Sequence, residues 1–398
     1  MKKVCFITPG HISSNPRLIK EALALSNVGY KVHIIFTQYM DYLIREDVKI
    51  LQENPSWTYD NLIWLSSNKM LRLKSFLIQK LAEYIFPSSS ARNFLINRNF
   101  YWQLRMATRI KADLYIGHNL GALPVAVKAA QSTKSKCGFD AEDFHRNEIT
   151  NDSNNSDFKL KKFIEDKYLK EIDYLSAASP LIAKAYQNLY PDISPVTINN
   201  VFEIKYQPEI NLKKHKELKL FWFSQTIGKG RGLEEVIAAL NVIKNPLIEL
   251  HLLGSSSIEN KRYFDEMYFS KIIFHPSISN NDIFPFTRNF DVGLATELKY
   301  PFNRDICLTN KLFTYLVSGL AIVASDTKAQ TEFMAKNNNV GRLYQSGNTN
   351  ELVNILNEIF VERDLLDTHK KNAYKLAQSK YNWEKEQQKF LSLINDQI

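Results

Sequence analysis

The chain has 398 residues, too many for one small core, because single hydrophobic cores stop growing at about 250 to 300 residues. Its composition, 44% hydrophobic and 23% charged, excludes a chain that is disordered throughout. Three distant cysteines without CxxC spacing argue against a disulfide framework and a zinc site. We therefore expect two globular domains of ordinary size.

Nearly the whole net charge of +9 is concentrated in one segment. Nine basic residues and one acid, Glu83, lie between Lys69 and Lys111 among apolar and aromatic residues. Two interpretations stay open for segment 69–111: core-packing helices with a solvated basic face, or contact with an anionic membrane surface or lipid-linked substrate. No recognition helix, zinc finger or RNP-like motif accompanies the charge, so nucleic acid is not an expected partner.

Apolar runs in the chain are short. The run before Pro9 is too short for a signal-peptide core, and no run approaches the roughly 18 residues of a membrane span. We expect a cytoplasmic protein, which under the second interpretation of segment 69–111 contacts the inner face of the cell membrane.

The first half of the chain alternates predicted strands and helices, which indicates a parallel, doubly wound sheet. The strands are expected at Lys3–Thr8, Lys31–Thr37, Ala112–Gly117, Lys136–Phe139, Tyr174–Ala178 and Val196–Asn199, and helices at Arg17–Asn27, Leu123–Gln131, about 158–171 and from Pro180 onward.

The second half repeats this alternation without repeating the sequence. Strands are expected at Leu218–Ser224, Ile248–Gly254, Ile272–His275, Val292–Ala295 and Ala321–Ala324, with helices at Leu233–Leu240, about 281–288 and Lys311–Val317. The predicted fold class is α/β, with two Rossmann-like doubly wound parallel-sheet domains, 1–203 and 204–380, facing an interdomain cleft. A terminal helix within about 381–398 is expected to pack back on the first domain.

Two loops of the second domain are suited to phosphate. Lys229, Gly230, Arg231 and Gly232 connect a strand to a helix, with two cations beside backbone that a phosphate can approach closely. Thr309, Asn310 and Lys311 open a helix, whose unpaired N–H groups and macrodipole attract anions. We expect both loops to converge on one diphosphate, with Arg231 as its main cation and Lys311 and Lys229 behind it.

Polar residues also follow the strands of the first domain. His118 and Asn119 follow one strand, Asp140 to Asp143 form an acidic turn after another, and Gly10 to Asn15 form a loop after the first. At the carboxyl ends of parallel strands these residues are placed for a ligand. GxSxG, HExxH and Asp-x-Asp motifs are absent from these places, which argues against hydrolase and metalloprotease activities and against a metal.

Taken in order, these segments resemble the family 4 glycosyltransferases, retaining enzymes of the GT-B fold that use nucleotide diphosphate-sugars. The resemblance spans nearly the whole chain and rests on TPGHISSNPRLIKEALALSNVGYKVHII, GHNLGALP, GFDAED, EDKYLKEIDYLSAASPLIAKAY, TINN, WFSQTIGKGRGLEEVIAAL, LHLLG and NRDICLTNKLFTYLVSGLAIVASDT.

The resemblance implies roles for matching positions. It implies a donor-sugar contact for His118, a loop that closes on donor or acceptor at Gly10, and diphosphate binding by Arg231, Asn310 and Lys311. It also implies a nucleobase-lining segment that includes His275, Ser277 and Ile278, and an acceptor side with Asn119, Asp140 and Asp143.

The chain departs from the family where two glutamates seven residues apart are usual. Ile306 and Thr314 occupy these positions, and Thr314 retains a hydroxyl for a ribose. Gln225 replaces the family's arginine at the end of the second domain's first strand.

The implied reaction is metal-independent and cofactor-free transfer, with retention, to a lipid-linked or saccharide acceptor in polysaccharide assembly. Two alternatives remain: a sugar-nucleotide epimerase or phosphorylase of the same fold, and a non-catalytic partner subunit.

Overall fold

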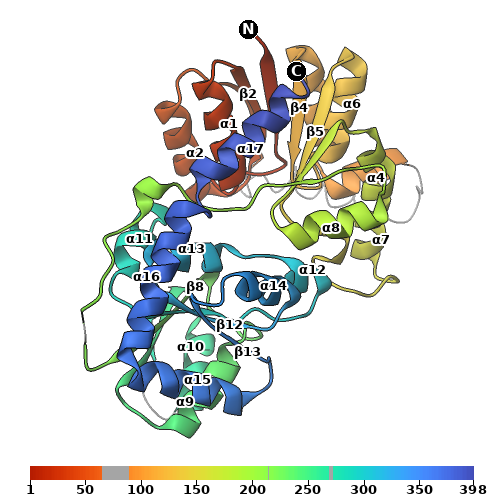
Figure 1. Cartoon of the computed structure of the whole chain (residues 1–398). Helices are drawn as coiled ribbons and strands as arrows, with labels where there is room; N and C mark the ends of the chain where they lie inside the picture. The colour runs from red at the N-terminus through yellow and green to blue at the C-terminus, as the bar shows by residue number, and fades with distance from the viewer. Residues whose placement is uncertain (65–88, 214, 269–271) are drawn as a thin grey trace. The chain divides into compact units, whose positions relative to one another are not determined.

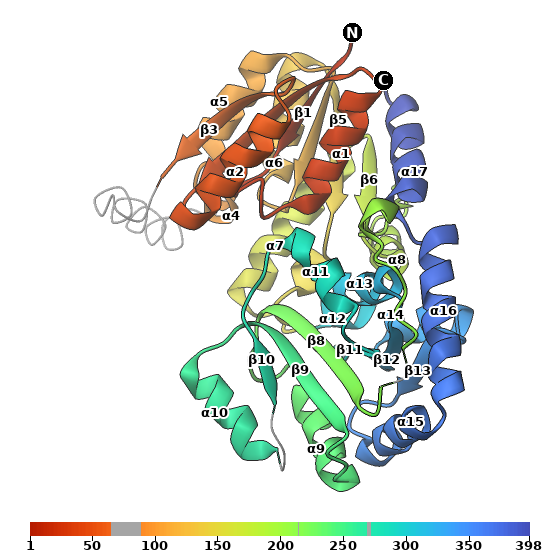
Figure 2. The ribbon, with the colours of Figure 1, turned by 90° about the vertical axis from the view of Figure 1, so that its left-hand side faces the viewer.

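Two parallel β-sheets organise the chain (Figure 1), and the computed structural model describes residues 1–64, 89–213, 215–268 and 272–398. Unit 1 comprises Met1–Ile198 and Gln387–Ile398, and unit 2 comprises Asn199–Glu386. Each unit has its own sheet with helices on both faces (Figure 2), so the predicted α/β class with two doubly wound parallel sheets is confirmed. We had expected the boundaries at 203 and 380.

The sheet of unit 1 has seven strands in the order β3-β2-β1-β4-β5-β6-β7, all parallel. The strands are β1 (Lys3–Ile7), β2 (Lys31–Gln38), β3 (Thr58–Ile63), β4 (Leu114–His118), β5 (Lys136–Ala141), β6 (Tyr174–Ala177) and β7 (Val196–Thr197). The helices are α1 (Pro16–Asn27), α2 (Asp41–Glu53), α4 (Ser89–Ile96), α5 (Phe100–Ile110), α6 (Leu123–Thr133), α7 (Ser156–Tyr168) and α8 (Pro180–Leu189), with short 3₁₀ turns η1 (His145–Asn147) and η2 (Leu169–Glu171).

Local sequence explains where α1 begins and ends. The side chain of Asn15 caps the helix by accepting a hydrogen bond from the N–H of Leu18 at 3.0 Å, and Pro16 supplies a fixed φ in the first turn. Gly29, with a φ of 93°, follows the helix and turns the chain into β2. The loop and helix therefore hold Arg17 and Glu21 one turn apart against the sheet.

The sheet of unit 2 has six strands in the order β10-β9-β8-β11-β12-β13, again all parallel. Its strands are β8 (Leu218–Thr226), β9 (Ile248–Ser255), β10 (Ile273–His275), β11 (Val292–Ala295), β12 (Ala321–Ser325) and β13 (Gly341–Tyr344). Its helices are η3 (Ile204–Tyr206, a 3₁₀ turn), α9 (Leu233–Ile243), α10 (Ile258–Met267), α11 (Asn280–Thr287), α12 (Phe302–Ile306), α13 (Asn310–Ser318), α14 (Lys328–Lys336), α15 (Thr349–Val361) and α16 (Arg363–Ser379).

The core of unit 2 lies between its sheet and the helices α9, α10 and α15. Alternate side chains of β8, including Leu220 and Trp222, pack there against Val236 of α9 and Leu352 of α15, and all four are almost fully buried. Helix α13 packs on β11 and on α16. Gly319, with a φ of 65°, ends α13.

The final helix, α17 (Trp383–Asn395), contributes to both units. The backbone N–H of Trp383 donates to Phe202 O at 2.9 Å within unit 2. From Gln387 onward the chain belongs to unit 1, where Phe390 and Ile394 are fully buried and Tyr30 donates to Asn395 at 3.0 Å.

Several elements were not predicted from the sequence, among them α2, β3, α14, α15 and α16. Of the basic segment 69–111, residues 69–88 lie outside the described residues, and the remainder forms α4, α5 and the loop before β4. None of the helices in the described part of the chain combines the length and apolar character that crossing a bilayer requires.

Both sheets reverse their strand order at an internal position, between β1 and β4 in unit 1 and between β8 and β11 in unit 2. Ligands of open parallel sheets bind beyond the carboxyl ends of strands at such positions. In unit 1 these ends carry Gly10 and His118, and in unit 2 they carry the 228–232 glycine loop and Glu297.

Candidate functional site

The glycine loop of unit 2 is packed on the loop that follows β11. Gly230 and Gly232 have φ angles of 68° and 78°, in the left-handed region that favours glycine. A Cβ on Gly232 would lie 2.2 Å from the carbonyl oxygen of Thr296, so this approach requires glycine. The Thr296 hydroxyl donates to the carbonyl oxygen of Arg231 at 3.0 Å.

Arg231 carries a positive charge that no described carboxylate balances. Its guanidinium donates to two hydroxyls, Ser224 Oγ at 2.9 Å and Thr226 Oγ1 at 3.2 Å, at the carboxyl end of β8. Hydroxyls orient the guanidinium without neutralising it, which leaves it suited to an anionic ligand. Lys229 is exposed, with its ammonium 4.1 Å from the centre of the Tyr263 ring.

Glu297, in the loop after β11, contacts the start of α13 and was missed by the sequence analysis. Its Oε1 accepts from Lys311 Nζ at 2.6 Å and from Thr309 Oγ1 at 3.2 Å. Burial alone would raise the pKa of Glu297, but Lys311 and Thr309 outweigh burial and lower that pKa. Lys311 is therefore already paired in the absence of a ligand.

Thr309 is the N-cap of α13, but its hydroxyl does not cap the helix. The hydroxyl donates to Glu297, and the first backbone N–H groups of the helix have no side-chain cap. These N–H groups are therefore left to bind an anion. Asn310, the first residue of the helix, is exposed.

The expected nucleobase segment lies at the end of β10. The His275 ring stacks on His251 with centres 5.3 Å apart, and His275 Nε2 lies 3.0 Å from His251 Nδ1. Ser277 is exposed and Ile278 is half-buried. Their contact with a nucleobase stays a prediction.

The two positions where the family usually has glutamates are buried in unit 2. Ile306 is 3% exposed and Thr314 is 1% exposed. Thr314 therefore offers little surface to a ligand, and its contact with a ribose stays a prediction.

A buried ion pair joins α1 to β5 in unit 1. Arg17 donates twice to Asp140, at 2.7 and 2.6 Å, and once to the carbonyl oxygen of Ile198. Asp140 also accepts from Ser176 Oγ at 2.7 Å. Burial alone would raise the pKa of Asp140, but Arg17 outweighs it and lowers that pKa to about 2.

The location expected for Asp140 was wrong. Strand β5 continues to Ala141, so Asp140 lies inside the strand, fully buried, and not in an acidic turn. A charged residue is tolerated in this strand because Arg17 neutralises it. Its predicted contact with an acceptor remains untested.

His118, the last residue of β4, is fully buried among carboxylates. Its Nε2 lies 3.2 Å from Glu21, and its Nδ1 lies 3.5 Å from Asp140 and 3.7 Å from Glu142. Burial alone would lower the pKa of His118, but the three carboxylates raise it to about 10. The ring is therefore a cation at neutral pH.

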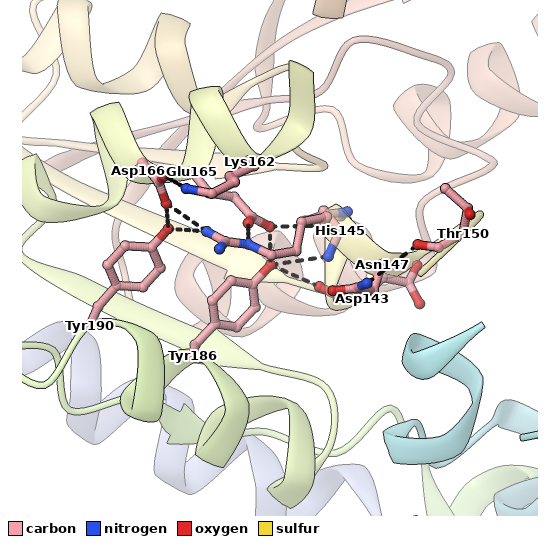
Figure 3. A network of polar contacts seen from close by, with 10 residues as sticks. Asp143, His145, Asn147, Thr150, Lys162, Glu165, Asp166, Tyr186 and Tyr190 are labelled. Atoms are coloured by element: carbon pink, nitrogen blue, oxygen red, sulfur yellow. Dashed lines mark hydrogen bonds and ion pairs between the residues drawn. The ribbon is translucent and has the colours of Figure 1, made fainter. Parts of the chain in front are cut away.

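The remaining candidates of unit 1 lie in loops at the carboxyl ends of strands. Gly10 is half-buried beside the ring of Tyr39. Asn119 is half-buried and adopts a left-handed φ of 67°. Asp143 is half-buried, and its carbonyl oxygen accepts from the Tyr186 hydroxyl at 3.2 Å (Figure 3).

One group of side chains in the described residues has the spacing of a metal site. Ligand atoms of Glu21, His118 and Asp140 lie within 4.8 Å of one another. Both oxygens of Asp140 are already engaged by Arg17, and the ring nitrogens of His118 face different carboxylates. These side chains are therefore better suited to hold the Arg17 and His118 cations than a metal ion.

No protein-family model and no curated protein matches the sequence, but solved structures match the fold. Sucrose-phosphate synthase from Thermosynechococcus elongatus aligns with 100% of this chain and 99% of its own, with a TM-score of 0.73 and 14% identity. Anabaena HepE in complex with UDP and glucose aligns over 100% of both chains, with a TM-score of 0.69 and 14% identity. A glycosyltransferase from Rickettsia africae aligns with 99% of this chain and 98% of its own, with a TM-score of 0.70 and 14% identity.

The chain has the GT-B fold. The fold predicted from the sequence is thereby confirmed, and at 14% identity the likeness establishes the fold alone. Units 1 and 2 correspond to its two parallel-sheet domains, and the expected cleft between them stays a prediction.

Proposed function

We propose that the protein is a glycosyltransferase that moves a sugar from a nucleoside diphosphate to a saccharide or lipid-linked acceptor, with retention of anomeric configuration and without a metal. The observation that carries this proposal is Arg231, a cation on the glycine loop that no described carboxylate balances. Its backbone is hydrogen-bonded to Thr296, and the next residue, Glu297, pairs with Lys311. The GT-B fold supports it, as does HepE, a protein of this fold solved with UDP-glucose.

On this proposal the leaving diphosphate is the group that the protein stabilises. Arg231 and the uncapped start of α13 supply positive charge at the carboxyl ends of β8 and β11, and Lys311, which is paired with Glu297, adds an ammonium donor. Fixed donors aimed at developing negative charge are usually the largest single contribution to catalysis. A departing phosphate oxygen takes the proton of the attacking acceptor hydroxyl, so no protein base is needed.

Donor binding is the first test. Thermal unfolding is measured with UDP, UDP-glucose, UDP-N-acetylglucosamine and GDP-mannose, for the wild type, Arg231→Ala and the control Arg262→Ala, an exposed arginine of α10. A donor at 100 times its Kd stabilises by about 2.7 kcal/mol. We expect stabilisation by one nucleotide class, retained in Arg262→Ala and reduced in Arg231→Ala.

Other outcomes separate the alternatives. If no nucleotide stabilises the protein, the non-catalytic partner subunit is favoured. If the bound sugar nucleotide changes without any acceptor, or is cleaved by free phosphate, the epimerase or the phosphorylase is favoured.

We also propose that the described part of the basic segment, 89–111, contacts anionic lipid at the inner face of the cell membrane. It has five basic residues and no acid, and Arg105, Arg109 and Lys111 are exposed without an ion-pair partner among the described residues. Tyr101 on α5 is also exposed, at 57%. Exposed cations beside an amphipathic aromatic ring suit an anionic bilayer.

Vesicle co-sedimentation tests this contact. We expect binding to phosphatidylglycerol vesicles and none to phosphatidylcholine vesicles. Arg105→Gln with Arg109→Gln should weaken binding by about tenfold or more, since each basic residue near such a surface contributes about 1 kcal/mol. Lys159→Gln with Lys170→Gln removes the same charge elsewhere on unit 1 and should not. Equal loss in both double variants would contradict a role for α5.

A further inference from the structure

Two buried polar atoms of unit 1 face each other without a hydrogen bond. Nδ1 of His118 lies 3.7 Å from Oε1 of Glu142, and neither atom has a hydrogen-bond partner among the described residues. Buried polar groups are nearly always hydrogen-bonded, because an unsatisfied one destabilises the fold. This pair therefore has hydrogen-bonding capacity that the protein itself does not use.

The other members of the cluster leave Glu142 as its outward-facing group. Asp140 is saturated by Arg17 and Ser176, and Glu21 faces the opposite nitrogen of the His118 ring. The side chains of His118, Asp140 and Glu21 are 0 to 1% exposed, whereas that of Glu142 is 22% exposed. Glu142 is therefore the member of the cluster that solvent reaches.

The chain on both sides of Glu142 is held in place. The N–H of Ala178 donates to the carbonyl oxygen of Ala141 at 3.1 Å, and the Tyr186 hydroxyl donates to that of Asp143 at 3.2 Å. Figure 3 shows the network beyond, in which the single Tyr186 hydroxyl hydrogen is shared between the Asp143 carbonyl and the closer Glu165 carboxylate, 2.8 Å away. A carboxylate on an already fixed backbone loses little conformational entropy when it binds a ligand.

The chemistry of the cluster favours a neutral, hydroxyl-rich ligand. The member of the cluster that solvent reaches, Glu142, is a carboxylate, which repels a phosphate. A carboxylate accepts hydrogen bonds and donates none, which matches neighbouring sugar hydroxyls. Such bonds to an ionised acceptor are the stronger kind.

We propose that Glu142, backed by the His118 imidazolium, binds the hydroxyl groups of a saccharide. Glu142 accepts the hydroxyl hydrogens, and His118, 3.7 Å away, orients the carboxylate. That this saccharide is a substrate of transfer rests on the proposed function. Hydroxyl binding at Glu142 does not depend on it.

Imidazole ¹⁵N NMR of the full chain tests this site, because the His118 signal reports on Glu142 directly. The probes are methyl α-glucoside and methyl N-acetyl-α-glucosaminide at high millimolar concentration, UDP, and UDP-glucose. We expect a saccharide probe to shift the His118 signals. Glu142→Gln should weaken that response by about tenfold or more, since hydrogen bonds to charged groups contribute about 1.5 to 3 kcal/mol.

Two further variants keep the test decisive. Glu171→Gln removes one exposed carboxylate of unit 1 outside the cluster and should respond like the wild type. Glu142→Asp keeps the charge on a shorter side chain and should respond weakly. If a free glycoside shifts the His118 ¹⁵N signals, the site is assigned to the acceptor. If UDP-glucose shifts these signals more than UDP does, the site is assigned to the donor sugar.

The proposal is overturned if no saccharide probe shifts His118 in the wild type, or if Glu142→Gln responds as the wild type does. The first of these results would mean that the unsatisfied atoms hold water only. Stabilisation by UDP is measured separately, so loss of saccharide binding at Glu142 does not count against a nucleotide site in unit 2.

Discussion

Arg231 is the residue on which the proposed chemistry depends most. Its guanidinium is oriented by hydroxyls of β8 and balanced by no described carboxylate. Once a transferred sugar and donor are known, Arg231→Ala should lower kcat by about 10²-fold or more, the range seen when one transition-state donor is removed. Steady-state kinetics check this, and Arg262→Ala, on α10, should keep the wild-type kcat. An unchanged kcat in Arg231→Ala would remove it from the mechanism.

His118 should make stability depend on pH in the alkaline range. Its pKa is raised from 6.5 to about 10, so its contribution is fully present below pH 6.5 and is lost as the pH rises through about 10. In His118→Gln the free energy of unfolding should fall less between pH 7 and pH 10 than in the wild type. Urea unfolding at both pH values measures this. An equal change in the free energy of unfolding between pH 7 and pH 10 in both proteins would show that His118 is neutral in the folded state.

Single charged residues mark the limit of what the sequence predicted. The predicted strand stops before Asp140, because burying an unpaired carboxylate is unfavourable. The residue that neutralises Asp140 is Arg17, which lies 123 positions away in the sequence. Arg17 and Glu21 are one helical turn apart on a face otherwise made of buried apolar residues, a signal that was present and not used. Glu297 gave no such signal, because its partners depend on how two loops pack.

At the scale of elements, the glycine loop before α9 carries a matched pair of positions. Gly230 and Gly232 both have left-handed φ angles, but a Cβ on Gly230 meets nothing within 4 Å, whereas one on Gly232 meets Thr296. Gly230→Ala should cost about 1 to 2 kcal/mol of stability and Gly232→Ala about 2 to 4 kcal/mol, since the second adds a clash. Chemical denaturation measures both, and equal costs would contradict the packing of this loop on Thr296.

Elements were predictable where burial is continuous and less so where it is not. Strands β4, β8 and β12 are apolar runs, and the sequence analysis placed each within two residues of its ends. Strand β3 is an edge strand whose sequence, TYDNLI, is mostly exposed or half-buried and has no apolar run. Strand β3 pairs with β2 through backbone hydrogen bonds, and a pattern of apolar residues does not reveal such pairing.

At the scale of the whole molecule, the last twelve residues should decide the stability of unit 1. Deleting 387–398 removes Phe390 and Ile394, both fully buried in that unit. Burial of two such side chains contributes roughly 3 to 6 kcal/mol. Native-state hydrogen exchange should show weaker protection in unit 1 and unchanged protection in unit 2. A uniform loss across both units would mean that α17 stabilises them jointly.

The path of α17 also sets an order of events during synthesis. Unit 2 is one continuous stretch, Asn199–Glu386, whereas unit 1 needs residues from both sides of it. Domains fold as units while the chain emerges from the ribosome, usually from the N-terminus onward. Here the order of completion is reversed. The unit translated first keeps an open apolar surface until the final twelve residues arrive, and it is the part of the newborn chain on which a chaperone would act longest.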